Sequence, residues 1–220
     1  GDHAGLAAGG GDLDADAVVL ALPATPAAKL LRPLLPHAAD ELAAIDYASV
    51  AIVTLAYQPG AVGVHRPGSG FLVAAGERRV IKACTWSSQK WPHLGGDPLV
   101  VRCSVGRAGE TAALRQDDAD LVAAVHADLS QVMQLCAAPV ESRVTRWGGA
   151  LPQYAVGHLE RVARVEQAVE TLPGLAVAGA AYRGVGIPAC IDSGERAGAR
   201  TIAHLRDGTM GGVEGEHRDG

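Results

Sequence analysis

The sequence predicts a mixed α/β fold, in which strand–helix units near both ends of the chain accompany an antiparallel sheet in the middle. Two observations support this prediction. Short apolar runs precede helical patterns at residues 16–45 and 174–205, and four β-rich segments separated by turn residues lie in a row between them. With 220 residues and 48% hydrophobic side chains, the chain has enough apolar material for a sizeable core.

The amino-terminal part is expected to form a loop or hairpin end, then one strand and two short helices. Residues 1–16 are rich in Gly and Asp, and the continuous apolar run 16–23 is typical of a strand covered on both faces. Thr25 is the expected N-cap of the next helix, with Pro26 at its first position. A second helix or turn is expected at 37–45.

The middle of the chain predicts an antiparallel sheet followed by an amphipathic helix. The expected strands are residues 49–58, 68–74, 78–86 and 98–106. Residues 117–136 then carry apolar side chains at helical spacing. Leu121, Val125 and Leu129 form the apolar stripe, and two carboxylates at the start of the segment suit the positive end of a helix.

The carboxyl-terminal part predicts strands and helices in alternation. Residues 141–149 read as a strand, and a helix follows that ends near Glu170. The apolar strand 174–182 leads through a glycine-rich turn into the helix 184–205. The segment from Asp207 onward is almost free of apolar side chains, so we expect it to be disordered.

Composition excludes several function classes. The net charge of −5 argues against a nucleic-acid binder, and no apolar run is long enough for a transmembrane helix. The four cysteines form no CxxC pair and the histidines form no HxxxH or HExxH motif, so we expect no metal site and mostly buried, reduced thiols. The cysteines are Cys84, Cys103, Cys136 and Cys190. Because the chain begins with Gly1 rather than Met, we expect it to be a piece of a longer protein.

The segment that carries chemistry is the glycine-rich turn at 184–189. It matches G-x-G-x-x-G/A, but Pro188 lies inside the motif and no suitable ribose-binding acid follows it, so it departs from the dinucleotide fingerprint. Glycines let the backbone approach a flat ring or a phosphate closely, and the following helix begins with a partial positive charge. A phosphate or a flavin edge suits such a turn. The alternative is a turn that only packs a helix against a strand.

Four segments together resemble a known family. The most informative, AVAGAAYRGVGIPACIDSGERA at 176–197, resembles the C-terminal flavin motif of protoporphyrinogen and coproporphyrinogen oxidases. Segments 144–162, 70–93 and 15–31 resemble further parts of the same family, in the same order along the chain. These enzymes belong to the FAD-dependent amine-oxidase-like superfamily. The resemblance implies part of a two-lobed FAD-binding fold with an antiparallel substrate-domain sheet.

The resemblance also implies cofactor-binding residues. Trp147 would lie against the FAD, and Val185, Gly186 and Ile187 would meet its isoalloxazine ring. The family pattern further includes Pro152, Gln153, Tyr154 and His158, for which a structural role is the alternative. No catalytic acid–base side chain and no metal are implied.

The resemblance divides the chain into lobes. Residues 1–46 and 139–206 would belong to the FAD lobe, residues 47–138 to the substrate-binding sheet and helix, and 207–220 to the tail. The family begins with a strand and a GxGxxG turn that hold the ADP moiety, and this chain lacks that Rossmann element. The chain thus resembles the C-terminal half, and the other half of the FAD domain is an expected partner.

The implied reaction is the oxygen-dependent oxidation of coproporphyrinogen III to coproporphyrin III, by hydride transfer to the flavin in three cycles that yield hydrogen peroxide. Basic side chains would hold the carboxylates of the porphyrinogen substrate; the candidates are Lys82, Lys90, Arg102 and Arg146. The alternatives are a protoporphyrinogen IX oxidase, another amine-oxidase-like flavoenzyme, and a non-catalytic split half that docks to a partner. A cytoplasmic location is expected. Peripheral membrane contact through residues 117–136 is the alternative to core packing of that helix.

Overall fold

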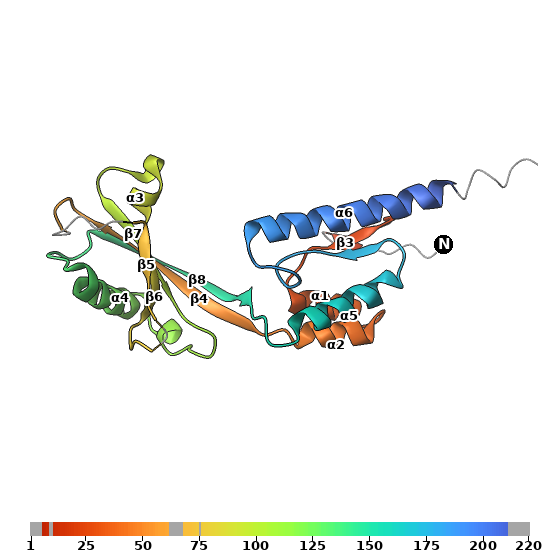
Figure 1. The fold of residues 1–220 in the computed structure, drawn as a ribbon, viewed down its shortest axis with the longest axis horizontal. Helices are drawn as coiled ribbons and strands as arrows, with labels where there is room; N and C mark the ends of the chain where they lie inside the picture. Colours follow the sequence, from red (N-terminus) through yellow and green to blue (C-terminus); the bar gives the residue numbers. More distant parts are fainter. Residues whose placement is uncertain (1–5, 9–10, 62–67, 75, 211–220) are drawn as a thin grey trace, which may run out of the picture. The chain divides into compact units, whose positions relative to one another are not determined.

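The computed structural model describes residues 6–8, 11–61, 68–74 and 76–210 of the chain. It divides the chain into two compact units (Figure 1). Unit 1 contains the residues up to Asp46 and those from Pro152 onward, and unit 2 runs from Tyr47 to Leu151. The mixed α/β class and the antiparallel sheet predicted from the sequence are confirmed.

Unit 1 is built on two short parallel strands with helices on both sides (Figure 1). Its elements are the hairpin β1 (Leu6–Ala8) and β2 (Gly11–Leu13), strands β3 (Val18–Leu20) and β9 (Leu175–Val177), and helices α1 (Ala24–Leu31), α2 (Pro36–Ala43), α5 (His158–Glu170) and α6 (Ile187–Met210). Helix α6 packs on β3 and β9, while α1, α2 and α5 pack on one another at the other side. Buried alanines, such as Ala27 and Ala39, let these short helices approach closely.

Unit 2 is a five-stranded sheet with one long helix on one face. Its strands are β4 (Tyr47–Tyr57), β5 (Gly70–Leu72), β6 (Ile81–Trp86), β7 (Leu99–Val105) and β8 (Glu141–Pro152), in the spatial order β5-β6-β7-β4-β8. The short helices α3 (Ser87–Lys90), η1 (Pro92–Leu94) and η2 (Ala113–Arg115) lie in its connections. Alternate residues such as Val53, Leu55 and Val101 face the core, as the pleat of a half-covered sheet requires.

The predicted amphipathic helix is confirmed as α4 (Asp118–Met133), which covers the core face of the sheet. Asp117 caps it, because its carboxylate accepts the amide of Asp120 at 2.8 Å. At the end of β4, the hydroxyl of Tyr57 lies 3.0 Å from Nδ1 of His126 on α4, and burial raises the pKa of this phenol. The apolar stripe of α4 packs in the core of unit 2. Of the two interpretations of this stripe, core packing and peripheral membrane contact, the structure agrees with core packing.

Three local predictions for the amino-terminal part are wrong in detail. The strand spans only Val18–Leu20 and Val19 is exposed, because β3 pairs with β9 along one edge and lacks full cover on both faces. Helix α1 begins at Ala24, so Thr25 lies inside the helix and Pro26 occupies its third position rather than its first. Pro23 occupies the N-cap position without a side-chain hydrogen bond. The helix therefore relies on buried alanines rather than on a polar cap.

The division of the chain also differs from the predicted lobes. The boundary at 46/47 agrees with the two units, but the second boundary lies at Leu151/Pro152 and not at 138/139. Strand β8 belongs to the sheet of unit 2, where it lies beside β4. Strand β8 is placed in unit 2 because it pairs with β4, which lies about a hundred residues earlier in the sequence. Helix α6 runs to Met210, past the predicted start of a disordered tail, and residues 211–220 lie outside the described part.

Two of the four cysteines are buried as predicted. Cys84 and Cys103 are cross-strand neighbours on β6 and β7, and contact with Cys84 together with burial raises the pKa of the Cys103 thiol. Cys136 is exposed and Cys190 is partly exposed, in contrast to the expectation for the group as a whole. All four are free thiols.

Candidate flavin-binding site

The turn between β9 and α6 needs a glycine at one of its two motif positions. Gly184 has φ of +156°, and a Cβ there would lie 2.5 Å from the Cβ of Ala189, so a side chain would clash. At Gly186 the nearest atom to an added Cβ is Cδ of Pro188 at 3.8 Å, an ordinary contact. Gly184 is thus required by the fold of the turn, whereas Gly186 leaves open backbone that a ligand can approach.

The residues around Gly186 form an exposed, apolar helix start. The side chains of Val185 and Ile187 are 51% and 77% exposed, and neither packs into the core of unit 1. Pro188 occupies the second position of α6, where its missing amide costs no helical hydrogen bond. The first turn of this 24-residue helix carries no acidic side chain, so the partial positive charge at its start is not neutralised there.

Two aromatic side chains hold the turn in place: Tyr154, which lies between β8 and α5, and His158, the first residue of α5. The hydroxyl of Tyr154 donates to the carbonyl of Ala180 at 2.6 Å, and Nε2 of His158 lies 2.8 Å from the carbonyl oxygen of Tyr182. The two rings are stacked with centroids 3.8 Å apart. Since a carbonyl oxygen only accepts, Nε2 carries the proton and donates it. His158 is buried and acts as a structural tether of the turn, which is the structural alternative weighed for this residue.

Two further contacts, which were not predicted from the sequence, fix the segment that leads into the turn. The hydroxyl of Ser193 accepts the amide of Gly179 at 3.1 Å, and Arg183 donates to the carboxylate of Glu166 on α5 at 3.0 Å. A usable sequence signal exists for Ser193. Together with Ala197 and Thr201 it forms a buried stripe at four-residue spacing along α6, and a hydroxyl on such a stripe often bonds backbone.

These features fit the edge of a flavin ring. The backbone at Gly186 is open, the flanking side chains are apolar and exposed, and the helix start presents unpaired amides with a positive potential. Val185, Gly186 and Ile187 are therefore the residues of unit 1 that would hold the isoalloxazine, as expected from the resemblance. Direct contact with FAD remains a prediction for each of them.

Trp147, the fourth expected cofactor residue, lies on β8 of unit 2. Its neighbours fix the face that it occupies: Val144 packs against the core below α4, and Arg146 forms an ion pair with Asp118 of α4. Side chains alternate along a strand, so Trp147 points to the face opposite α4. It is 54% exposed, which leaves a large aromatic surface available for a ligand.

The four basic candidates for substrate carboxylates have different environments. Arg146 is already engaged, because it pairs with Asp118 and donates to the carbonyl of Gln116 at 2.8 Å. Lys90 lies 4.9 Å above the ring of Trp91. Arg102 is exposed on the face opposite α4, between Thr54 and Thr85 in the register of the sheet. These positions favour Arg102 over Arg146 as an available cation.

Lys82, the fourth basic candidate, is the extra residue of a β-bulge between Ile81 and Ala83 on β6. It is partly buried, and this desolvation, followed by the nearby charge of Arg107, lowers the pKa of its ammonium group. A partly desolvated cation attracts an anion more strongly than a fully hydrated one. Lys82 therefore also remains available.

A small cavity of about 240 Å³ lies beside the turn in unit 1, between α5, β9 and α6. Each of its arginines has its own carboxylate partner: Arg183 pairs with Glu166, Arg196 with Asp192 and Arg200 with Glu170. The cavity is too small for a flavin, and its charges are balanced. Among the described residues, no group of three or more metal-ligating side chains comes together, and no helix has the length and apolar character to cross a membrane.

Comparisons with known proteins give the family. The model of the family described as flavin-containing amine oxidoreductase matches residues 2–202. The coproporphyrinogen III oxidase of Bacillus subtilis is 36% identical over 88% of this chain and 41% of its own length, and that of Mycobacterium bovis is 40% identical over 89% and 42%. A solved structure from Exiguobacterium sp. 255-15, provisionally named protoporphyrinogen oxidase, is 33% identical with a TM-score of 0.77, over 92% of this chain and 44% of that one.

The chain thus spans less than half the length of these relatives. The family match nevertheless extends across both units, from the first strands through most of α6, and includes the turn at 184–187. The chain therefore belongs to the family of flavin-containing amine oxidoreductases, and its cofactor is FAD.

Proposed function

We propose that the chain is part of an oxygen-dependent oxidase that converts coproporphyrinogen III to coproporphyrin III in haem biosynthesis. The observation that carries the proposal is the similarity, over nearly nine tenths of this chain, to two bacterial proteins of that name. The open glycine turn at the start of α6 supports it, because an oxidase of this kind needs a flavin edge at an anion-stabilising site. The proposal includes a cytoplasmic location.

FAD held at the turn of Val185, Gly186 and Ile187 would supply the redox chemistry: hydride acceptance from the porphyrinogen and electron transfer to molecular oxygen, in three cycles that would each form one H₂O₂ from one O₂. The chain's own part is to bind and to orient. The amides at the start of α6 stabilise the negative charge that develops on the ring edge, and the apolar side chains of Val185 and Ile187 exclude water there.

In unit 2, the face of the sheet opposite α4 is the proposed substrate surface. On this face Trp147 offers an aromatic plane and Arg102 offers a cation for a carboxylate. Lys82, at the bulge of β6, offers a second cation. Coproporphyrinogen III carries more carboxylates than protoporphyrinogen IX, so cations that have no carboxylate partner among the described residues favour the former. No side chain is needed as a catalytic acid or base in this scheme.

Protoporphyrinogen IX oxidation is the second candidate, since a solved structure at 33% identity is provisionally named for that activity. Another amine-oxidase-like flavoenzyme is less well supported, because an amine substrate calls for a cage of aromatic side chains and only 4% of residues here are aromatic. The colour of the purified protein distinguishes the remaining alternative, a non-catalytic half that docks to a partner. Such a half would be colourless, whereas a flavoenzyme is yellow.

The test compares the two porphyrinogens as substrates of the purified protein that carries this chain. Porphyrin fluorescence measures product, and an oxygen electrode with a peroxide assay measures the electron acceptor. We expect faster product formation from coproporphyrinogen III, with one H₂O₂ formed for each O₂ consumed. A clear preference for protoporphyrinogen IX, or turnover without oxygen uptake, contradicts the proposal.

A further inference from the structure

Unit 2 contains a cavity with an excess of positive charge. Its volume is about 640 Å³, and its walls are the segment 76–80 before β6 and the segment 106–115 after β7. Four arginines and two glutamates line it. The arginines are Arg78, Arg79, Arg107 and Arg115, and the glutamates are Glu77 and Glu110.

One of these arginines is fully committed to the protein. Arg79 pairs with Glu77 at 3.3 Å and with Asp128 of α4 at 3.5 Å, and it donates to the side chain of Gln131 at 3.1 Å. Asp128 also accepts the amides of Val80 and Ile81 at 2.7 and 3.1 Å. These bonds fix one wall of the cavity on α4, and they use the carboxylates of Glu77 and Asp128.

Arg107 is only partly satisfied. Its Nη1 lies 3.6 Å from Oε2 of Glu110, which is an ion pair but longer than a hydrogen bond. Its Nη2 is buried and, among the residues that the structure describes, has no hydrogen-bond partner. A guanidinium carries five N–H donors, and a buried donor without an acceptor is costly, so the hydrogen bonding of Arg107 is incomplete. Because Nη2 itself is closed to solvent, an anion in the cavity would contact the fifth of the side chain that is accessible.

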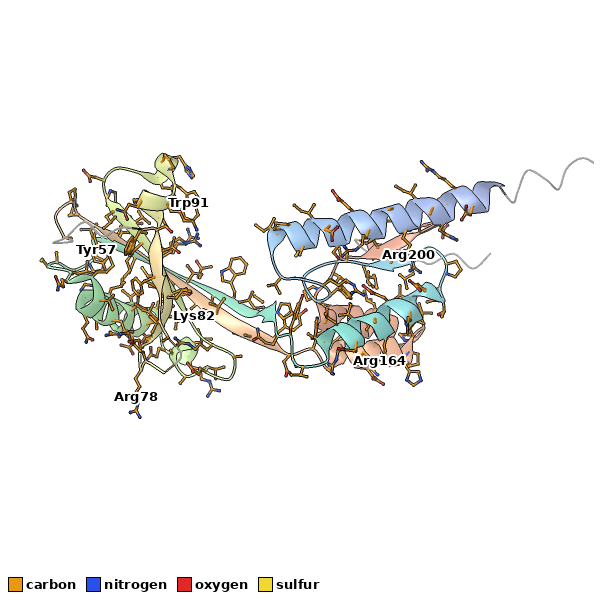
Figure 2. The ribbon with its side chains drawn as sticks, viewed as in Figure 1. Tyr57, Arg78, Lys82, Trp91, Arg164 and Arg200 are labelled. Carbon is orange, nitrogen blue, oxygen red and sulfur yellow. The ribbon has the colours of Figure 1, made fainter. Side chains whose placement is uncertain are left out.

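Two further arginines line the cavity without a carboxylate partner among the described residues. Arg115 donates only to the hydroxyl of Thr111, at 3.4 Å. Arg78 is exposed and extends beyond the ribbon at the edge of unit 2 (Figure 2). Of the three guanidinium groups of Arg78, Arg107 and Arg115, only that of Arg107 is paired with a carboxylate among the described residues, that of Glu110. The positive field reaches Lys82, whose pKa is lowered by burial first and by the charge of Arg107 second.

In the cavity of unit 1, by comparison, every arginine charge is balanced by a carboxylate. There, Arg183, Arg196 and Arg200 each have a separate carboxylate partner. Among the residues that the structure describes, the cavity of unit 2 lacks such partners for Arg78 and Arg115. Arginine forks bind phosphate and carboxylate groups through paired, charge-assisted hydrogen bonds, so a ligand with two negative charges and several oxygens restores the balance.

We propose that the cavity lined by Arg78, Arg107 and Arg115 binds a compact oxyanion with two negative charges. A phosphate group and a pair of neighbouring carboxylates both have this chemistry. The bonds of Asp128 to the amides of Val80 and Ile81 fix the backbone on one side of the cavity. On the other side the turn at Gly106 is tight, since φ is +99° and an added Cβ would lie 2.8 Å from the carbonyl oxygen of Ser49. The site belongs to unit 2 and the flavin turn to unit 1, and the proposal does not rest on the oxidase activity.

The test is titration calorimetry on the full chain at low ionic strength, with inorganic phosphate and malonate as separate probes and chloride as the control anion. We expect saturable binding of at least one oxyanion at one site. Arg107→Gln weakens it by about tenfold or more, the loss expected for a charge-assisted bidentate contact, and the exposed Arg115→Gln by about threefold. Arg143→Gln, an exposed arginine of unit 2 outside this cavity, leaves the affinity unchanged.

Each outcome bears on the site. Tighter binding of phosphate assigns a phosphoryl ligand, and tighter binding of malonate assigns a dicarboxylate. Circular dichroism checks that the Arg107→Gln protein is folded. If it is not folded, the anion affinity of the Arg115→Gln protein still tests the proposal. The proposal is overturned by an absence of saturable binding, by unchanged affinity in Arg115→Gln and in folded Arg107→Gln, or by an equal loss in Arg143→Gln.

Discussion

The two glycines of the turn before α6 have different roles, although the motif treats them alike. The fold of the turn requires glycine at position 184, since a side chain there would clash with Ala189. The fold does not require glycine at position 186, because an added Cβ would make only an ordinary contact with Pro188. A glycine that the fold does not require, at the exposed start of a long helix, points to a ligand that needs the space.

The tether formed by Tyr154 and His158 gives the first prediction at the residue scale. His158→Ala removes the bond to the carbonyl of Tyr182 and the ring stack, so the turn loses its fixed position. We expect the Kd for FAD to rise about five- to tenfold, the equivalent of one lost hydrogen bond, while the fold is retained. Fluorescence titration with FAD measures this.

Two variants control this prediction. Tyr154→Phe keeps the stack and loses only the 2.6 Å bond to Ala180, so its effect is smaller than that of His158→Ala. His37→Ala, on the exposed side of α2, leaves the Kd unchanged. An unaltered Kd in His158→Ala means that the tether does not position the turn.

At the scale of elements, α4 is the part of unit 2 that the sequence predicted best. Its apolar stripe has one period and one partner, the core face of the sheet, so local pattern and tertiary packing agree. Leu129→Ala removes a fully buried side chain from this stripe, and we expect unfolding to become easier by about 2–5 kcal/mol. Chemical denaturation followed by circular dichroism measures the loss.

Ala127→Ser, on the exposed side of the same helix, is the matched control, with an expected change within about 0.5 kcal/mol. A loss below about 1 kcal/mol in Leu129→Ala would show that α4 is not packed as described.

An ion cluster between α2 and α5 gives a prediction on pH. Glu41 pairs with Arg164 and Arg161, and the hydrogen bond from Arg164 lowers the pKa of this carboxyl. A lowered pKa stabilises the folded chain at pH values above the ordinary value, and this contribution disappears as pH falls through the folded value. Glu41→Gln therefore lowers Tm at pH 7, and the difference from the unaltered chain shrinks as the pH falls below about 4.

Differential scanning calorimetry at several pH values measures this difference, which is small because the pair is partly exposed. Glu195→Gln, at an exposed site on α6, serves as the control and shows no such pH dependence. A constant difference in Tm between pH 7 and pH 3 would assign the effect to packing and not to the ion pair.

At the scale of the whole molecule, the sequence predicted the fold class and most elements but not their partners. Residues 141–149 were correctly predicted to form a strand. The position of this strand beside β4, however, depends on contacts with residues about a hundred positions earlier, such as the hydrogen bond from the amide of Gly149 to the hydroxyl of Ser49. The apolar run at 16–23 predicted a short strand covered on both faces, but pairing with β9 leaves only Val18–Leu20 in the sheet. Local pattern carries no information about such long-range pairing.

The candidate site shows the same limit. The turn and Trp147 were identified from the sequence, because glycines, an aromatic residue and family motifs mark them directly. The supporting contacts of Ser193 and of the Arg183–Glu166 pair were missed, since each joins elements that are separate in sequence. The commitment of Arg146 to Asp118 was missed for the same reason.

The central claim is that the start of α6 presents open backbone and positive potential to the ring of FAD. The most direct measurement is the FAD-to-protein ratio, from flavin absorbance, of the purified protein that carries Gly186→Leu. Gly194→Leu, in open space on the same helix, is the matched control. The account predicts a folded Gly186→Leu protein that has lost its flavin and a control that keeps it, and full flavin occupancy in Gly186→Leu would contradict it.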